Sequence, residues 1–312
     1  MGAARTAREG KQVAGRVSSG QGSRPEAKLA LQAIESYLRR RFILHATACV
    51  TATSFSKLLA VLAQQERGNQ TVKPELTTVK ACVFDTFGTV VDWRSSVIAE
   101  ATSWGKAKGL NINWAEFTDR WRLGYGPAMD KVRKGEIPWT TLDDLQRMIL
   151  EDLLKQYKIA GLSEAEKIEW SHVWRRLQPW SDSVEGLTRL KDKYIISPMS
   201  SGNVALMANL AKFGGLPWDL ILDSDLVQHY KPDREMYMSA PLFLDLKPEQ
   251  VMMCAAHVPD LRAARNYGLR TGFIYRPNEY GGGPAGAPDK AKPGDFDVVC
   301  VSIVDLAQQM GA

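Results

Sequence analysis

A carboxylate at the end of an apolar segment is the strongest chemical signal in this chain. Residues 79–84 are mostly apolar, and Asp85 follows them directly and opens the sequence DTFGT. Burying an ionised carboxylate is costly unless the group is paired or takes part in chemistry. A desolvated carboxylate held in position is suited to act as a covalent nucleophile. The segment alone is equally compatible with a capped turn between a strand and a loop.

Further polar side chains follow other apolar segments along the chain. They supply hydroxyls, an ammonium group, an imidazole and a second carboxylate. In chain order they are Ser200, Ser201, Lys231, His257 and Asp260. A serine turn, a solvated lysine before a proline or a helix N-cap explains each one separately. Their repeated position at predicted strand ends favours a shared site.

The elements that would position these side chains alternate between strand and helix patterns. We expect strands at 79–84, 193–200, 219–225, 251–257, 270–275 and 297–302. We expect helices at 205–214, 235–246, 259–268 and 303–310. This alternation indicates an α/β fold with a Rossmann-like, mainly parallel sheet covered on both faces. Ligands of such sheets bind at the carboxyl ends of the strands.

A Trp-rich insertion follows the first predicted strand. Apolar residues recur at helical spacing near 96–109, 114–133, 141–157 and 163–177. We therefore expect a core domain made of residues 79–94 and 181–312, with residues 95–180 as a helical domain inserted into it. The Gly/Pro-rich stretch 278–297 is expected to be a long surface connection between the last two strands.

The polar residues at the strand ends resemble, in order, the four motifs of the haloacid dehalogenase (HAD) superfamily. Asp85 to Thr89 resembles motif I, Ser200 motif II, Lys231 motif III and Asp260 motif IV. Tyr237, six residues after Lys231, and the C-terminal RPNEYG are typical of the type II (L-)2-haloacid dehalogenases. The helical insertion is similar to the cap domain of that branch, and WRLGYGPAM resembles its cap segment, which implies a substrate arginine at Arg122.

Two features distinguish this branch from the superfamily's phosphatases. The phosphatases carry a second acid two residues after the nucleophile, where this chain has Phe87. Their fourth motif also supports Mg²⁺ with an extra Asp, and the aligned positions here are Ala255 and Ala256. Mg²⁺ needs oxygen ligands. The resemblance therefore implies carbon–halide hydrolysis with no metal and no cofactor.

The resemblance also implies a mechanism. Asp85 would attack C2 of a 2-haloalkanoate and form an ester, with inversion at C2. Lys231 would keep Asp85 ionised, and Lys231 and Asp260 would aid the water that cleaves the ester, with His257 influencing that water. The remaining groups would bind the halide or the substrate carboxylate. They are Thr86, Phe87, Thr89, Arg122, Ser200, Ser201, Tyr237 and His257.

The chain departs from the family pattern at positions that would contact the departing halide and the water that cleaves the ester. Family members usually have Asn after the motif II Ser, where this chain has Ser201. His257 stands where some members have Asn, and Val258-Pro259 stands where polar residues or Trp are common. These differences leave the preferred halide among fluoride, chloride and bromide open.

Three rival hypotheses remain. A phosphatase of the same superfamily would release phosphate in the presence of Mg²⁺. A catalytically silent HAD-like binding protein would use its basic extension for docking. An enzyme of related chemistry would act on an unhalogenated acid. The partner expected here is a small 2-haloacid, with neither nucleic acid nor membrane, and the resemblance suggests a homodimer.

Charge and cysteine content separate the N-terminal extension from the rest. Of 40 Lys/Arg and 35 Asp/Glu, residues 1–78 hold 12 and 5, so the extension carries +7 and residues 79–312 carry −2. The basic charge therefore gives no support for a nucleic-acid role of the main domain. We expect Cys82, Cys254 and Cys300 to be buried thiols, which favours a reducing compartment such as the cytoplasm.

The extension itself allows several interpretations. Residues 1–24 are expected to be disordered, 25–42 to form a helix, and 42–63 to be a poor membrane span because the stretch contains His45 and Lys57. The extension could be a transit peptide or an export signal. It could also be non-catalytic sequence, or sequence upstream of the true start. We favour a poorly ordered extension without a part in the chemistry.

Overall fold

The computed structural model describes residues 73–282 and 286–312. The predictions for residues 1–72 lie outside the described residues. The described residues belong to one compact unit. Within the described ranges, no helix combines the length and the apolar character that crossing a bilayer requires.

A parallel sheet of five strands lies at the centre of the described chain, in the order β4-β1-β5-β6-β7. The strands are β1 (Ala81–Phe84), β4 (Ile195–Pro198), β5 (Val251–Ala255), β6 (Arg270–Ile274) and β7 (Val298–Cys300). In register, Val83 lies between Ser197 of β4 and Met253 of β5. The predicted parallel α/β fold is confirmed. Because β1 lies inside the sheet, Asp85 emerges with the ends of β4 and β5 on either side.

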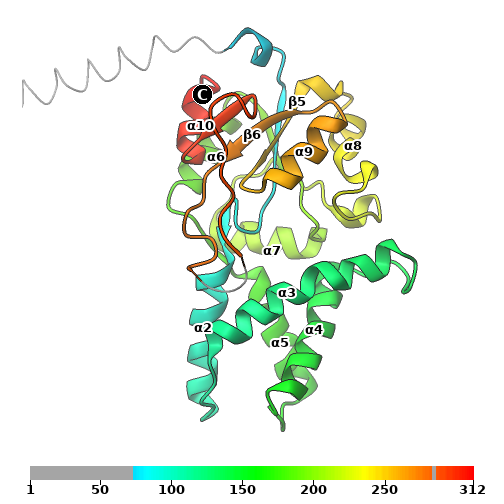
Figure 1. Ribbon diagram of the computed structural model, residues 1–312, viewed down its shortest axis with the longest axis vertical. Coiled ribbons are helices and arrows are strands. Elements are labelled where there is room, and N and C mark those ends of the chain that lie inside the picture. The colour runs from blue at the N-terminus through cyan, green and yellow to red at the C-terminus, as the bar shows by residue number, and fades with distance from the viewer. Residues whose placement is uncertain (1–72, 283–285) are drawn as a thin grey trace, which may run out of the picture. The chain divides into compact units, whose positions relative to one another are not determined.

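Helices cover both faces of this sheet, as Figure 1 shows. Ala81 and Val83 pack with α8 and α9, whereas Cys82 and Phe84 pack in the cluster that contains α6, α7 and α10. This alternation follows from the two-residue period of a strand. The helices are α6 (Ser183–Lys191), α7 (Val204–Gly214), α8 (Arg234–Phe243), α9 (Val258–Asn266) and α10 (Ile303–Gln309). The predicted buried thiols are confirmed, since Cys82, Cys254 and Cys300 are buried and free.

One predicted strand, residues 219–225, is wrong. The chain does run beside β4 there, but polar side chains replace part of the ladder. Ile196 N donates to Asp219 Oδ2 at 2.9 Å, and Leu222 N donates to Ser197 Oγ at 3.1 Å. The segment then forms the 3₁₀ turn η3 (Ser224–Leu226). Local apolar content predicted a strand, but the side-chain hydrogen bonds prevent regular pairing.

The Trp-rich insertion forms the predicted helices, which Figure 1 shows grouped together on one side of the sheet. They are α2 (Trp93–Ala107), α3 (Trp114–Arg133), α4 (Leu142–Gln156) and α5 (Glu164–Ser171), followed by the 3₁₀ turn η2 (His172–Arg175). Side chains of Asn113, Thr141 and Ser163 cap α3, α4 and α5. Trp104 and Trp170 stack at 4.3 Å between ring centroids and join α2 to α5.

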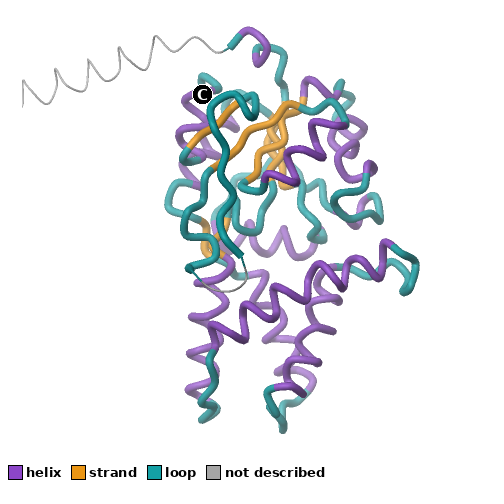
Figure 2. Tube along the Cα trace, viewed as in Figure 1, coloured by secondary structure: helices purple, strands orange, loops and turns teal. Residues whose placement is uncertain are grey.

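A short antiparallel pair connects the two ends of this insertion. β2 (Val91–Asp92) pairs with β3 (Gln178–Pro179), with Val91 opposite Pro179. Figure 2 shows the other strands together in the upper part of the view, whereas most of the insertion consists of helices joined by loops. The division of the compact unit into a core and a cap domain stays a prediction.

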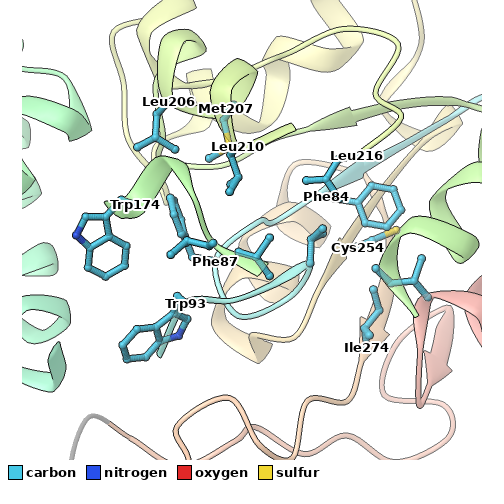
Figure 3. Close-up of a cluster of buried hydrophobic side chains, with 14 of the residues drawn as sticks. Phe84, Phe87, Trp93, Trp174, Leu206, Met207, Leu210, Leu216, Cys254 and Ile274 are labelled. Atoms are coloured by element: carbon cyan, nitrogen blue, oxygen red, sulfur yellow. The ribbon is translucent and has the colours of Figure 1, made fainter. Parts of the chain in front are cut away.

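Aromatic side chains fill the space where the insertion meets the sheet. Phe87 contacts Trp174 edge-on at 6.1 Å, and Trp174 stacks on Trp93 at 6.2 Å. Figure 3 shows Phe87 between these two tryptophans and the sheet residues Phe84, Cys254 and Ile274. Phe87 therefore holds the loop after β1 against the helices of the insertion.

Candidate active site

Asp85 lies just beyond β1, where its carboxylate receives hydrogen bonds from three directions. Thr89 Oγ1 donates to Oδ2 at 2.8 Å, and Lys231 Nζ donates to Oδ1 at 3.3 Å. His257 Nδ1 lies 3.1 Å from Oδ2. Burial raises the pKa of Asp85, but the charges and hydrogen bonds of Lys231, His257 and Thr89 outweigh it and hold the pKa well below its ordinary value. Asp85 is therefore a buried and ionised carboxylate.

Lys231 also binds Asp260, from the first turn of α9. Lys231 Nζ donates to Asp260 Oδ2 at 2.6 Å, and Tyr237 Oη donates to Asp260 Oδ1 at 2.6 Å. Burial lowers the pKa of Lys231, but Asp260 and Asp85 raise it, and the net pKa lies above its ordinary value. The ammonium group therefore stays charged between two carboxylates, and both oxygens of Asp260 are engaged.

His257 stands between Asp85 and a second acid, Glu279, for which the sequence predicted no function. His257 Nε2 lies 2.9 Å from Glu279 Oε1 and 3.2 Å from Oε2. Burial lowers the pKa of His257, but its hydrogen bonds with Asp85 and Glu279 raise it to about 10. The imidazole is therefore doubly protonated at neutral pH. Glu279 follows β6, so it is one more polar side chain at the carboxyl end of the sheet.

The two threonines after Asp85 lie behind the carboxylate and do not line the pocket that Asp85 faces. The Thr89 hydroxyl donates to Asp85 and accepts from Ala256 N at 2.8 Å. The Thr86 hydroxyl is buried and has no partner among the described residues. We infer that Thr89 orients Asp85, since its hydroxyl proton is already donated to the carboxylate.

Side chains from two distant positions in the chain hold the loop that carries these residues in place. Trp180 Nε1 donates to Gly88 O at 2.9 Å, and Arg276 Nε donates to Thr89 O at 2.8 Å. Gly88 has φ +87°, and a Cβ there would lie 2.1 Å from Glu279 Oε1. Only glycine satisfies both conditions without strain. The loop is therefore fixed around Asp85.

Ser200 and Ser201 extend from the end of β4 to the same pocket. Both are buried, and Ser200 N donates to Asp223 Oδ1 at 2.9 Å. Asp223 is itself fully buried, and burial raises its pKa to about 8. No backbone carbonyl in the described ranges accepts from the N–H groups of Thr86 or Ser201. These N–H groups therefore have donor capacity left for a bound anion.

The insertion supplies the opposite wall of the pocket through α3. Arg122 lies over the Tyr125 ring at 4.5 Å and the Trp93 ring at 5.6 Å, and it makes no ion pair with the described residues. Arg120, two residues earlier, is exposed and pairs with Glu116 at 2.9 Å. Arg122 is thus the arginine of this helix that faces the pocket.

The resulting cavity is small, with the paired groups around Asp85 on one side and Arg122 on the other. Its volume is about 290 Å³. The predicted site residues Asp85, Phe87, Arg122, Ser200, Ser201, Lys231, Tyr237, His257 and Asp260 line it, together with Tyr125, Met129, Pro232 and Pro259. Residues that are far apart in the sequence therefore meet around one chamber. The space suits a molecule of a few heavy atoms with an anionic group.

The positions where phosphatases carry acids are apolar here. Phe87 is 4% exposed and makes an aromatic contact with Tyr125, and Ala255 and Ala256 at the end of β5 are buried. Across residues 73–282 and 286–312, no group of three or more His, Cys, Asp or Glu side chains is arranged to hold a metal ion. The oxygen donors of a Mg²⁺ site are missing at the places where the superfamily's phosphatases have them.

Comparison with known proteins gives the same class. The family described as haloacid dehalogenase-like hydrolase matches residues 79–268. The solved defluorinating L-2-haloacid dehalogenase Rha0230 is 42% identical, with 75% of this chain and 96% of that chain covered and a TM-score of 0.72. The solved L-2-haloacid dehalogenase PA0810 is 46% identical, with coverage of 74% and 98% and a TM-score of 0.71.

A curated relative extends the comparison. The (S)-2-haloacid dehalogenase 4A of Burkholderia cepacia is 28% identical over 212 residues, which cover 65% of this chain and 87% of the relative. The chain therefore belongs to the haloacid dehalogenase-like hydrolases, in the branch of the L-2-haloacid dehalogenases. The family predicted from the four motifs is confirmed.

Proposed function

We propose that this chain hydrolyses the carbon–halogen bond of small 2-haloalkanoic acids and forms 2-hydroxyacids through an ester on Asp85. One observation carries the proposal. An ionised, buried Asp85 faces a small cavity whose opposite wall holds Arg122, which makes no ion pair with the described residues. A nucleophile on one side and a cation for the departing halide on the other suit an in-line displacement.

In the first step, an oxygen of Asp85 attacks C2 while the carbon–halogen bond breaks. Lys231 and His257 keep the carboxylate ionised, and Thr89 fixes its orientation. Alignment of attacking and leaving groups contributes about 7–11 kcal/mol in well-oriented reactions. Because the attack is in line, C2 inverts, and an (S)-2-haloacid gives an (R)-2-hydroxyacid.

The halide leaves toward Arg122. The guanidinium lies over the Tyr125 and Trp93 rings, and these contacts hold it without neutralising its charge. Phe87 and Tyr125 give this side of the cavity apolar walls. A weakly hydrated cation in an apolar surrounding favours a desolvated anion such as a departing halide.

The substrate carboxylate binds near the end of β4. Ser200 and Ser201 line the cavity, and the N–H group of Ser201 is available as a donor. Ser201 stands where relatives of this branch usually have Asn. Its Oγ accepts from Lys231 N at 3.3 Å, so this hydroxyl supports the backbone of Lys231 as well as the cavity wall.

Asp260 and Tyr237 hold Lys231 in place. The two hydrogen bonds to Asp260 fix its carboxylate, which in turn fixes the ammonium 3.3 Å from Asp85. When the ester forms, Asp85 loses its charge and Lys231 is positioned to polarise the ester carbonyl. Water then attacks the carbonyl carbon and regenerates Asp85.

We also propose that residues 95–180 act as a cap domain and that the chain forms a homodimer. The surface of α3 and α4 supports the second proposal. Leu123 is 52% exposed and Met148 48% exposed, beside a groove of about 450 Å³ between these helices. Light scattering on the purified chain tests the assembly, and a monomer at micromolar concentration would contradict it.

Halide release from L- and D-2-chloropropionate and from chloro- and fluoroacetate, with EDTA present, tests the proposed reaction. Fluoroacetate is included because the relative Rha0230 is described as defluorinating. We expect release from the L-isomer and none from the variant Asp85→Asn. Phosphate release that requires Mg²⁺, without halide release from any of these acids, would overturn the proposal.

A further inference from the structure

Glu279 is a buried carboxylate outside the cavity, and the reaction steps above leave it without a function. It is 1% exposed and lies in the loop after β6. It contacts His257 Nε2 at 2.9 Å and Trp93 Nε1 at 3.4 Å. His257 in turn reaches Asp85 Oδ2 at 3.1 Å. The three groups therefore form a chain from the interior to the reacting carboxylate.

The backbone around Asp85 is shaped to admit Glu279. A Cβ at position 88 would lie 2.1 Å from Glu279 Oε1, so only the absence of a side chain leaves room for the carboxylate. Trp93 contacts the same oxygen from α2. Glu279 is thus enclosed on three sides, and its position relative to His257 is fixed independently of the substrate.

The charges around His257 explain how its protonation changes during turnover. Asp85 and Glu279 face its two nitrogens, and Lys231, Asp260 and Arg122 line the same cavity. In the free enzyme Asp85 is ionised, and the imidazole lies between its carboxylate and that of Glu279. Once Asp85 is an ester, Nδ1 has lost its anionic partner, while Nε2 still donates to Glu279. The proton on Nδ1 is then the one that leaves.

We propose that His257 is the general base that activates water for cleavage of the Asp85 ester, and that Glu279 is the positioning residue that holds its tautomer. This inference rests on the proposed function. A carboxylate that binds one imidazole nitrogen leaves the other free to accept a proton, as in Ser-His-Asp enzymes. Water bound to Nδ1 would stand beside the Asp85 carboxyl group, within reach for general base catalysis.

The protons and bonds balance over the cycle. Ester formation releases halide, and the Nδ1 proton leaves as the acid equivalent of the product. Nδ1 then takes a proton from water while the water oxygen bonds to Cγ of Asp85. The bond from Cγ to the ester oxygen breaks, and the alkoxide takes the proton back from His257. Asp85, now a carboxylic acid, returns its remaining proton to His257, which restores the ion pair.

Asp260 is a poorer candidate for this base. Its two oxygens accept from Lys231 and from Tyr237, each at 2.6 Å, so taking a proton from water would break an existing bond. Lys231 has a raised pKa and no free lone pair at neutral pH. Of the described side chains that hydrogen-bond to Asp85, which are Thr89, Lys231 and His257, the imidazole is the one whose nitrogen gains a free lone pair when the ester forms.

Rapid-quench measurement of halide and intact protein mass with L-2-chloropropionate tests the inference in the full chain. We expect His257→Asn to release one halide per active site in a burst and then turn over about 100-fold more slowly or worse. The covalent adduct should accumulate in this variant and stay low in the wild type. The exposed Glu185→Gln on α6 serves as the matched control and should behave as the wild type.

Glu279→Gln distinguishes positioning from a merely structural function. The neutral amide stabilises a protonated imidazole less than a carboxylate does, which lowers the pKa of His257. The acid limb of the pH profile for ester cleavage should therefore shift by about one pH unit or more to lower pH. The maximal rate should fall about tenfold or more, because the base is weaker. If Glu279→Gln fails to fold, as judged by circular dichroism, the burst of His257→Asn decides the inference.

The possible failures are distinct. A loss of burst and steady-state rates in equal proportion in His257→Asn would place His257 in ester formation and overturn the inference while leaving the proposed function intact. An unshifted pH profile in folded Glu279→Gln would show that Glu279 does not position His257. Absence of halide release from the wild type with every haloacid would refute the proposed function itself.

Discussion

Replacing Lys231 by methionine should make ester formation sensitive to acid. Lys231 Nζ lies 3.3 Å from Asp85 Oδ1 and is largely buried. Two unit charges at this distance interact by about 5 kcal/mol at an effective dielectric constant of about 20. That energy corresponds to a change of nearly four units in the pKa of Asp85, which is an upper limit. Measured effects of one opposite charge on a carboxyl pKa are about 1–3 units.

The direction of the change follows from the wild-type site. The folded-state pKa of Asp85 is below its ordinary value, so the wild-type nucleophile is ionised across the pH range of 4 to 8 used in the assay below. Removing the ammonium raises this pKa, because burial then acts without the charge that opposes it most strongly. The methionine variant therefore loses its reactive carboxylate at a higher pH than the wild type.

Single-turnover halide release between pH 4 and pH 8 measures this effect. We expect a level rate for the wild type and a falling acid limb for Lys231→Met, with Lys231→Arg close to the wild-type profile because the charge is retained. Circular dichroism at each pH controls for unfolding. A rate for Lys231→Met that is lowered but stays level to pH 4 would refute the reasoning that Lys231 keeps Asp85 ionised.

Three further predictions concern the halide site, a buried acid and the loop after β1. Arg122→Gln should slow the halide burst by about 100-fold or more, as is typical when one stabilising donor is lost. Arg120→Gln should keep the wild-type rate. Equal effects of the two variants in rapid-quench assays would contradict the assignment of Arg122 to the halide. Burial raises the folded-state pKa of Asp223 to about 8 from 3.8, so the folded chain binds the extra proton, and stability should fall by about 1.4 kcal/mol per unit as pH rises from about 4 to 8. Urea unfolding of Asp223→Asn should show a weaker pH dependence, and an unchanged slope would refute this. Gly88→Ala combines φ +87° with a clash against Glu279, so urea unfolding should show a loss of about 1–3 kcal/mol, and an unaltered midpoint would contradict the packing.

The sequence predicts the residues that follow strands most reliably. Asp85, Ser200 and Asp260 each come after an apolar segment, and parallel strands bring such positions to one edge of the sheet. Lys231 was assigned to the end of a strand at 219–225 that is not formed. The segment nevertheless runs beside β4, so Lys231 still reaches the site.

The choice between Arg120 and Arg122 of α3 needed the resemblance, although the sequence contained a second signal. Glu116 stands four residues before Arg120, a spacing at which helical side chains pair. The structure forms this pair at the surface. Position 118, four residues before Arg122, is Thr118, but Asp119 stands three residues before it, a spacing that also allows a pair. The structure pairs Asp119 with Arg94 instead, at 2.7 Å, so the spacing in the sequence favours Arg122 only weakly.

Glu279 could not be found by the same reasoning. It lies in a stretch rich in Gly and Pro, a composition that predicts a surface connection. Tertiary packing buries it between Trp93 and His257, more than 20 positions away in the chain. The available signal was weak: an acid shortly after the end of β6, at the same edge of the sheet as Asp85.

The central claim is that Asp85 bonds to carbon during turnover, and a single turnover in ¹⁸O-labelled water tests it most directly. With enzyme in excess over L-2-chloropropionate, the account predicts that the peptide containing Asp85 gains ¹⁸O and that the first 2-hydroxyacid formed carries none at its hydroxyl group. A labelled hydroxyacid together with an unlabelled Asp85 peptide would mean that water attacks C2 directly, and this result would contradict the account.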